Sequence, residues 1–117
     1  MRLNEIEFSD ATPIDAYGPG FFRIGGEVFH GDILVGATGA RPWGGLVDED
    51  ALLQLAGEVD VIFVGTGGEI AHIPQALRAR LEGAGLGVET MATPAACRTY
   101  NVLLSEGRRI AAALLAV

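Results

Sequence analysis

A turn of glycine and threonine is the first feature of the sequence that could bind a ligand. Residues 65 to 68 read Gly-Thr-Gly-Gly, between the apolar run 60–64 and a segment with helical spacing. In open α/β sheets, ligands bind at the carboxyl ends of strands, and glycine N–H groups at a helix start can hold a phosphate or carboxylate. The turn matches neither the dinucleotide fingerprint nor the phosphate-binding loop. A tight turn that needs glycine for backbone reasons is therefore the alternative interpretation.

Arg98 is the second candidate for ligand binding. It lies near the start of an expected helix, where the helix dipole does not favour a cation. It therefore either pairs with an acid, such as Glu69 or Glu106, or remains available for an anion. In the second case a single groove would gather the following residues: Gly65, Thr66, Gly67, Arg98, Thr99 and Asn101.

Cys97 is the only cysteine, so an intramolecular disulfide is impossible and a zinc site built on cysteines is excluded. A nucleophilic cysteine needs a base, and the histidines, His30 and His72, are far away in sequence. A helix start would favour its thiolate, whereas a small buried core residue is the simpler reading. The sequence thus shows no complete catalytic set: we assign no catalytic residue, lean against an enzyme, and expect no cofactor.

Trp43, between Pro42 and Gly44, has two readings. It is either exposed at an interface with a partner or it closes the edge of the core. The nearby acids of residues 48–50 are best read as a helix N-terminus, where they complement the dipole. Closely spaced acids on one helical turn rarely converge on one ion, so we expect no metal site.

The elements that position these residues fall into two halves. The first 40 residues favour β structure, with a hairpin about Gly25-Gly26 that supplies the positive φ of a tight turn. Leu3, Ile6 and Phe8 fit a short extended segment before it. We expect strands at 14–17, 21–24, 27–29 and 32–35, followed by a loop from Gly36 to Gly45.

The second half alternates between helix and strand. Helices are expected from residue 48, over 74–81 and from Thr93 to about Ser105, with strands at 60–64, 88–91 and 109–115. Thr93 followed by Pro94 predicts an N-cap and a proline at the first helical position. Such alternation argues for a mostly parallel sheet with helices on its faces.

A helical wheel divides the last helix into two faces. Its core face comprises Ala96, Cys97, Tyr100, Leu103 and Leu104, and its polar face comprises Arg98, Asn101 and Ser105. This division favours a buried Cys97 and makes Arg98 the stronger candidate for ligand binding.

Composition limits the class of protein. The 117 residues fit one domain, 1–117, and half of them are hydrophobic, which is typical of a well-cored globular chain. The net charge is -7 with no lysine, so nucleic-acid binding is not expected. The N-terminus lacks the apolar core of a signal peptide, and no apolar run is long enough to span a bilayer. These features predict a cytoplasmic protein.

Several of these motifs occur together, in order, in a known family. They are Tyr17-Gly18-x-Gly20-Phe21, the Pro-Trp loop at Trp43, Gly65-Thr66-Gly67, Met91-x-Thr93, Ala96-Cys97-Arg98-Thr99-Tyr100-Asn101-x-Leu103 and Glu106-Gly107-Arg108. The chain resembles, over nearly its whole length, the small-domain family of unassigned function that includes mitochondrial complex I assembly factor three and an adipogenesis-associated cytosolic protein.

The resemblance implies a three-layer α/β fold: a central, mostly parallel sheet with one antiparallel strand, flanking helices and an added β-hairpin layer. It also implies a groove near the Gly-Thr-Gly turn and the start of the Cys-Arg-Thr-Tyr-Asn helix. The first functional hypothesis is a non-catalytic binding or assembly factor for a respiratory or membrane complex, acting through a protein partner. The alternatives are a small-molecule enzyme or anion-binding protein that uses the candidate groove, and a homo-oligomer whose groove is a subunit contact.

Overall fold

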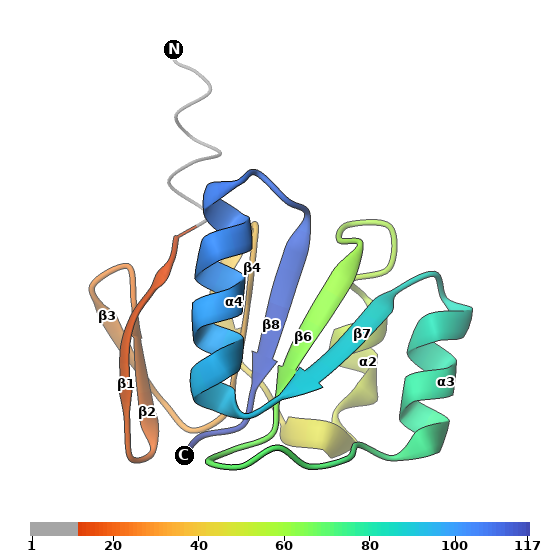
Figure 1. Ribbon diagram of the computed structural model, residues 1–117, viewed down its shortest axis with the longest axis horizontal. Coiled ribbons are helices and arrows are strands. Elements are labelled where there is room, and N and C mark those ends of the chain that lie inside the picture. The colour runs from red at the N-terminus through yellow and green to blue at the C-terminus, as the bar shows by residue number, and fades with distance from the viewer. Residues whose placement is uncertain (1–11) are drawn as a thin grey trace.

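Two β-sheets organise residues 12–117, the part of the chain that the computed structural model describes (Figure 1). The smaller sheet is an antiparallel meander of β1 (Ile14–Gly18), β2 (Phe21–Ile24) and β3 (Glu27–His30). The predicted turn at Gly25 and Gly26 joins β2 to β3, and both residues have positive φ, at 60° and 84°. The extended segment expected around Leu3, Ile6 and Phe8 lies outside the described residues.

The larger sheet has five strands in the order β5-β4-β8-β6-β7. Its strands are β4 (Ile33–Gly36), β5 (Gly39–Pro42), β6 (Val61–Gly65), β7 (Gly87–Met91) and β8 (Ile110–Leu114). β6 pairs in parallel with both β7 and β8, whereas β4 is antiparallel to its two neighbours. The expected single antiparallel strand is therefore β4, and the carboxyl ends of the other four strands share one edge.

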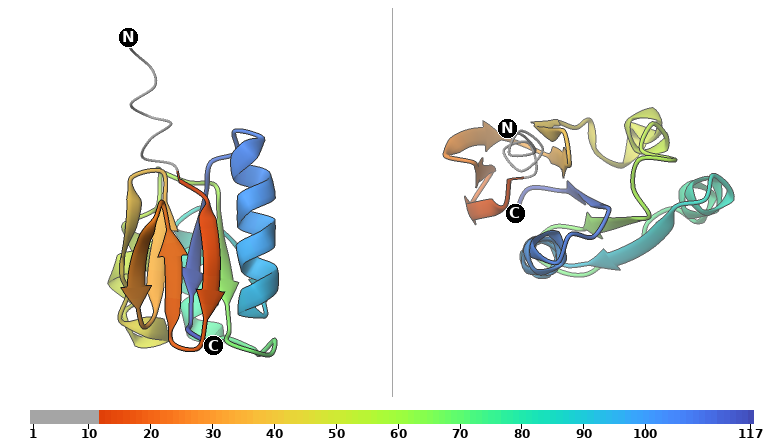
Figure 2. Two further views of the ribbon diagram at one scale, coloured as in Figure 1. Left: turned by 90° about the vertical axis from the view of Figure 1, so that its left-hand side faces the viewer. Right: turned by 90° about the horizontal axis from the view of Figure 1, so that it is seen from above.

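Helices cover both faces of this sheet. α2 (Glu49–Leu53) and α3 (Gln75–Gly83) lie on one face, while α4 (Thr93–Ser105) and the three-stranded sheet lie on the other (Figure 2). The core splits accordingly: Leu77 and Leu81 of α3 pack with Ile62, and Tyr100 of α4 packs with Phe22 and Phe63. The predicted three-layer α/β architecture is confirmed.

The prediction of a loop from Gly36 to Gly45 is wrong. Residues 36–45 were predicted to lack regular structure because of Pro42 and four glycines, but Gly39–Pro42 form strand β5. Within residues 12–117, β5 is an edge strand that pairs only with β4. Proline is tolerated there because its missing N–H group is not needed on the unpaired side of an edge strand. A glycine at φ 105°, Gly39, starts the strand after the turn.

The start of α4 also differs from the prediction. Thr93 is the first residue of the helix rather than its N-cap, and the cap residue is Ala92, in an extended conformation without a side-chain hydrogen bond. The hydroxyl of Thr93 is instead used for tertiary contacts, described below. The two predicted faces are confirmed: Ala96, Cys97 and Tyr100 are buried, and Arg98 is exposed.

Candidate functional site

The edge where four strands end carries the candidate residues, and we call it the carboxyl-end face. β5, β8, β6 and β7 all end there, so η1 (Gly45–Val47), the chain after Leu114, the loop 66–74 and the start of α4 lie at this edge (Figure 1). The turn between β1 and β2 joins them, since Gly20 N–H donates to the Val117 carbonyl at 3.0 Å.

The place in this face where an α/β sheet usually binds a ligand lies between β6 and β7. The chain leaves β6 towards α3 on one face and leaves β7 towards α4 on the other. Connections that diverge in this way open a crevice at the carboxyl ends of the two strands. Gly65 and Met91 are paired at this point, so the Gly-Thr-Gly turn lies at the crevice, as the sequence motif suggests.

Two threonine hydroxyls fill that crevice with hydrogen bonds. The Thr93 hydroxyl, in a fully buried residue, donates to the Leu115 carbonyl at 2.7 Å and accepts from Gly67 N–H at 2.8 Å. The Thr66 hydroxyl donates to the Glu69 carbonyl at 2.8 Å and accepts from Ala71 N–H at 2.9 Å.

The backbone of the turn is used in the same way. Thr66 N–H donates to the Met91 carbonyl at 2.9 Å, and Thr93 N–H donates to the Gly67 carbonyl at 2.7 Å. The N–H groups of Thr66 and Gly67 are therefore occupied and do not point free towards an anion. This geometry supports the backbone interpretation of the glycine turn over the anion-binding one.

Close packing explains why Gly65 is a glycine. A Cβ atom there would lie 2.8 Å from the Thr93 hydroxyl oxygen and 2.9 Å from both Thr93 Cα and a Leu114 methyl carbon. Contacts this short do not occur at real Cβ atoms, and one of these is with backbone. Gly67 has φ 98°, a conformation that side chains other than glycine rarely adopt.

A separate groove of about 320 Å³ lies between β1 and the first half of α4. Ile14, Asp15, Ala16 and Tyr17 line it from β1, and Cys97, Arg98 and Asn101 line it from α4. We call it the β1–α4 groove. It contains two of the six candidate ligand residues, Arg98 and Asn101, whereas Gly65, Thr66, Gly67 and Thr99 do not line it. The six do not form one pocket.

Asn101 has a structural partner in this groove. Its side-chain amide accepts from Ile14 N–H at 2.8 Å and donates to the Ile14 carbonyl at 2.8 Å. Both polar ends of the amide are thus used by one residue of β1. Asn101 attaches the edge of the small sheet to α4, a role that the sequence alone did not reveal because the two residues are 87 positions apart.

Cys97 lies in the wall of the groove, 4% exposed. Burial raises the pKa of its thiol from 9.0 to about 11, and the neighbouring Arg98 offsets only part of that effect. A thiol with this pKa is almost entirely protonated near neutral pH, and the thiolate is the reactive form. The structure therefore favours the core reading of Cys97.

Arg98 is the exposed cation of the groove. Within residues 12–117 it forms no ion pair, and in particular none joins it to Glu69 or Glu106. Among the residues that the structure describes, the only acidic side chain lining the groove is Asp15, whose carboxylate accepts from Gly26 N–H at 3.0 Å.

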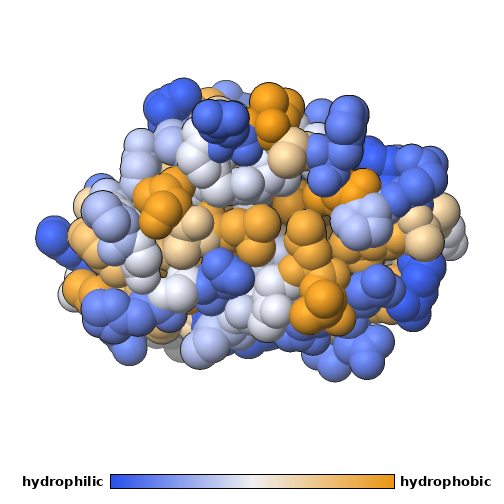
Figure 3. Space-filling model, turned by 90° about the horizontal axis from the view of Figure 1, so that it is seen from below, coloured by the Kyte–Doolittle hydropathy of each residue, from blue (hydrophilic) through white to orange (hydrophobic). Residues whose placement is uncertain are grey.

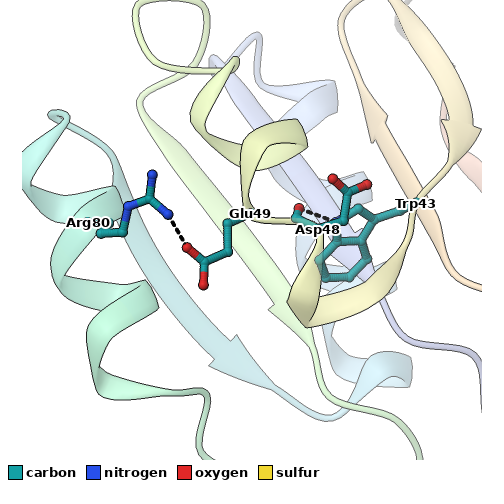
Figure 4. A network of polar contacts seen from close by, with 4 residues as sticks. All are labelled: Trp43, Asp48, Glu49 and Arg80. Carbon is teal, nitrogen blue, oxygen red and sulfur yellow. Dashed lines mark hydrogen bonds and ion pairs between the residues drawn. The ribbon is translucent and has the colours of Figure 1, made fainter.

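Trp43 closes the edge of the core, which is the second of its two interpretations. Its side chain is 5% exposed and packs with the cluster under α2 and α3, so the structure supports the core-edge interpretation and not the expected exposure. The indole N–H donates to the Asp48 carbonyl at 3.2 Å, and the next residue, Glu49, pairs with Arg80 of α3 (Figure 4). Burial of the ring is possible because β5 brings it to the end of the sheet.

Exposed apolar side chains on the carboxyl-end face are the feature that the sequence analysis missed. Val47 is 91% exposed, Ile70 is 67% exposed and Val117 is 38% exposed. All three follow strands that end at this edge, and Figure 3 shows an interrupted band of apolar groups across the face, among polar ones. Lone valine and isoleucine residues in loops carry no periodic signal, so only the fold brings them to one side.

Within residues 12–117, no helix is long and apolar enough to cross a membrane, and no group of three or more His, Cys, Asp or Glu side chains could hold a metal ion.

Known proteins resemble the chain over nearly all of its length. An uncharacterised protein of Rhodobacter capsulatus is 53% identical over 98% of this chain and 93% of its own. The mouse NADH dehydrogenase [ubiquinone] 1 alpha subcomplex assembly factor 3 is 34% identical over 98% of this chain and 66% of its own length. A crystal structure described as an outer membrane protein from Bartonella henselae superimposes with a TM-score of 0.83 at 35% identity, covering 93% of this chain and 98% of that one.

The family model described as protein of unknown function (DUF498/DUF598) matches residues 14–115. This range contains both sheets and all the helices described above. The predicted resemblance to the family of complex I assembly factor three is confirmed. The chain belongs to the DUF498/DUF598 family.

Proposed function

We propose that this protein is a non-catalytic binding protein that assists the assembly of a respiratory or other membrane complex by contacting a protein partner. The similarity to the mouse assembly factor, which extends over 98% of this chain, supports the class of function. The mouse protein is longer, so the shared part is the domain described here and not the whole of that protein.

The observation that carries the proposal is the apolar surface of the carboxyl-end face. Val47, at 91% exposure, and Ile70, at 67%, are far more exposed than branched aliphatic side chains usually are. Burying one such side chain contributes roughly 1.5–3 kcal/mol. Two of them at one edge offer a partner several kcal/mol of binding free energy, whereas this chain alone gains nothing from them.

The loop that holds Ile70 is suited to recognition because its shape is fixed. The Thr66 hydroxyl joins the start of the loop to Glu69 and Ala71, on either side of Ile70. A side chain presented on an ordered loop loses little entropy when it is buried by a partner. The structure thus offers a preformed apolar contact at a site that its own core does not need.

The test is a native co-purification with matched variants. The Val47→Asp/Ile70→Asp double variant places charge on the carboxyl-end face, and Val102→Asp does so on α4, where Val102 is 56% exposed. Partners identified by mass spectrometry with the wild-type chain should fall at least tenfold with the double variant and persist with Val102→Asp. Thermal unfolding confirms that the variants are folded. The proposal fails if the wild-type chain enriches no protein, or if the double variant retains the same partners at the same yield.

A further inference from the structure

Within residues 12–117, one β1 residue in the β1–α4 groove has a backbone N–H and C=O without a hydrogen-bond partner. Ile24 pairs with Glu27 across a two-residue turn, so their hydrogen bonds join β2 to β3. Successive residues of a strand direct their backbone N–H and C=O groups to opposite sides. Those of Phe22, two residues before Ile24, therefore also point towards β3. Its partner in β1, Tyr17, must therefore direct its N–H and C=O away from β2. In residues 12–117 no turn, loop or side-chain hydrogen bond reaches those two groups.

Asn101 shows which kind of group can bind to the edge of β1. Ile14 also directs its N–H and C=O away from β2, and the Asn101 amide binds both, as a residue of an added strand would. A β-bulge between Ile14 and Ala16 makes Tyr17, rather than Ala16, the next residue with the same orientation. Ile14 and Tyr17 both line the groove. The backbone groups of Ile14 are hydrogen-bonded to Asn101, whereas those of Tyr17 remain available to a ligand in the groove.

Arg98 lies beside that second residue. β1 and α4 run side by side in opposite directions (Figure 2), and Asn101 contacts Ile14 at the first residue of β1. Arg98 lies one turn of helix back from Asn101, which places it along β1 towards Tyr17. Both line the groove, and the Tyr17 residue is 40% exposed.

We propose that the β1–α4 groove binds an extended peptide segment of a partner protein, which adds to the edge of β1 at Tyr17 and places a carboxylate on Arg98. Addition of a strand to a free edge uses backbone hydrogen bonds for affinity and side-chain contacts for specificity. Ala16 and Cys97 supply apolar lining to the groove. A carboxylate of the peptide supplies the ion-pair partner that Arg98 lacks within residues 12–117. The inference rests on the proposed function, since it takes the peptide from a protein partner.

The experiment uses the whole chain and a displayed library of random heptapeptides with free carboxyl termini. The tightest sequence is then synthesised as the free acid, as the C-terminal amide and with single N-methyl groups along its backbone. Binding is followed by amide chemical shifts. We expect saturable shifts confined to residues 14–18 and 97–101, at least tenfold weaker binding after N-methylation at one position, and tenfold weaker binding to Arg98→Gln. Arg108→Gln, at another exposed arginine, should bind like the wild-type chain.

The outcomes separate this proposal from the proposed function. No enriched peptide, shifts centred outside the groove, or equal binding to Arg98→Gln would each overturn the groove proposal. The amide form identifies the source of the carboxylate: weaker binding assigns it to the terminus, and equal binding assigns it to an acidic side chain. If Arg98→Gln keeps every co-purified partner while Val47→Asp/Ile70→Asp loses them, the assembly proposal stands and the groove proposal does not.

Discussion

The crevice between β6 and β7 and the β1–α4 groove differ in how they use their polar groups. In the crevice, two threonine hydroxyls and the glycine backbone bond to one another. In the groove, Asn101 serves Ile14, but Tyr17 and Arg98 keep groups that residues 12–117 do not satisfy. A buried polar group without a partner costs free energy of folding. The hydrogen bonds of the crevice therefore stabilise the fold. At the place where the fold class usually binds a ligand, these polar groups are therefore used within the chain, whereas in the β1–α4 groove some remain available.

This difference predicts first that the crevice tolerates no added atom. Gly65→Ala places a Cβ within 2.9 Å of Thr93 Cα, which is backbone and cannot rotate away. We expect the free energy of unfolding in urea to fall by about 3 kcal/mol, at the upper end for overpacking of a core. Gly68→Ala, in the same turn, meets nothing within 4 Å and has no positive φ, so it should change stability by less than about 0.5 kcal/mol. Equal effects of the two variants would show that the crevice is not close-packed.

The hydroxyl of Thr93 provides the second test. Thr93→Val keeps the shape of the side chain but leaves Gly67 N–H and the Leu115 carbonyl without their partner. A buried group left unsatisfied costs about 1–3 kcal/mol. Both of these hydrogen bonds are part-buried, so we take the lower end of that range for each group and expect a total loss of about 2–3 kcal/mol in urea unfolding. Thr93→Ser retains the hydroxyl and should lose clearly less. If the two variants were equally stable, the hydrogen bonds in the crevice would not matter for stability.

Removing the Asn101 amide tests the groove in the same way. Asn101→Leu leaves the Ile14 N–H and C=O without partners beside a groove of about 320 Å³, which is large enough to admit water. Water can partly replace the amide there, so we expect a loss at the lower end of the range for unsatisfied groups, about 1–2 kcal/mol. The Ile14 amide should also exchange its hydrogen faster, because β1 is attached to α4 through this contact. Unchanged exchange at Ile14 in Asn101→Leu would contradict the role given to Asn101.

The sequence predicted the architecture well because the C-terminal half is governed by local patterns. Alternating apolar runs and helical spacing located α2, β6, α3, β7, α4 and β8, with Thr93 displaced from the cap to the first helical position. The missed strand β5 is short, contains Pro42 and is defined by its pairing with β4, which no local pattern reveals.

The candidate site was less predictable because each of its decisive contacts is long-range. Asn101 was assigned to the polar face of α4, correctly, but its partner Ile14 is 87 residues away. The two walls of the β1–α4 groove come from residues 14–17 and 97–101, and only strand pairing shows that Tyr17 has outward backbone groups. Residue type identified Arg98, and the fold decided which neighbours it has.

Cys97 gives the smallest and most specific test of the groove wall. Burial raises the pKa of its thiol from 9.0 to about 11, so the unfolded chain loses this proton at a lower pH than the folded chain. The stability contributed by the neutral thiol is complete below pH 9 and is lost as the pH rises from 9 to about 11. At pH 10 the loss amounts to about 1 kcal/mol. Cys97→Ala removes this dependence but leaves that of Tyr100, whose pKa burial raises to about 12. Urea unfolding of both chains between pH 8 and 11 measures the difference, and parallel pH profiles would mean that the thiol is not buried as the structure has it.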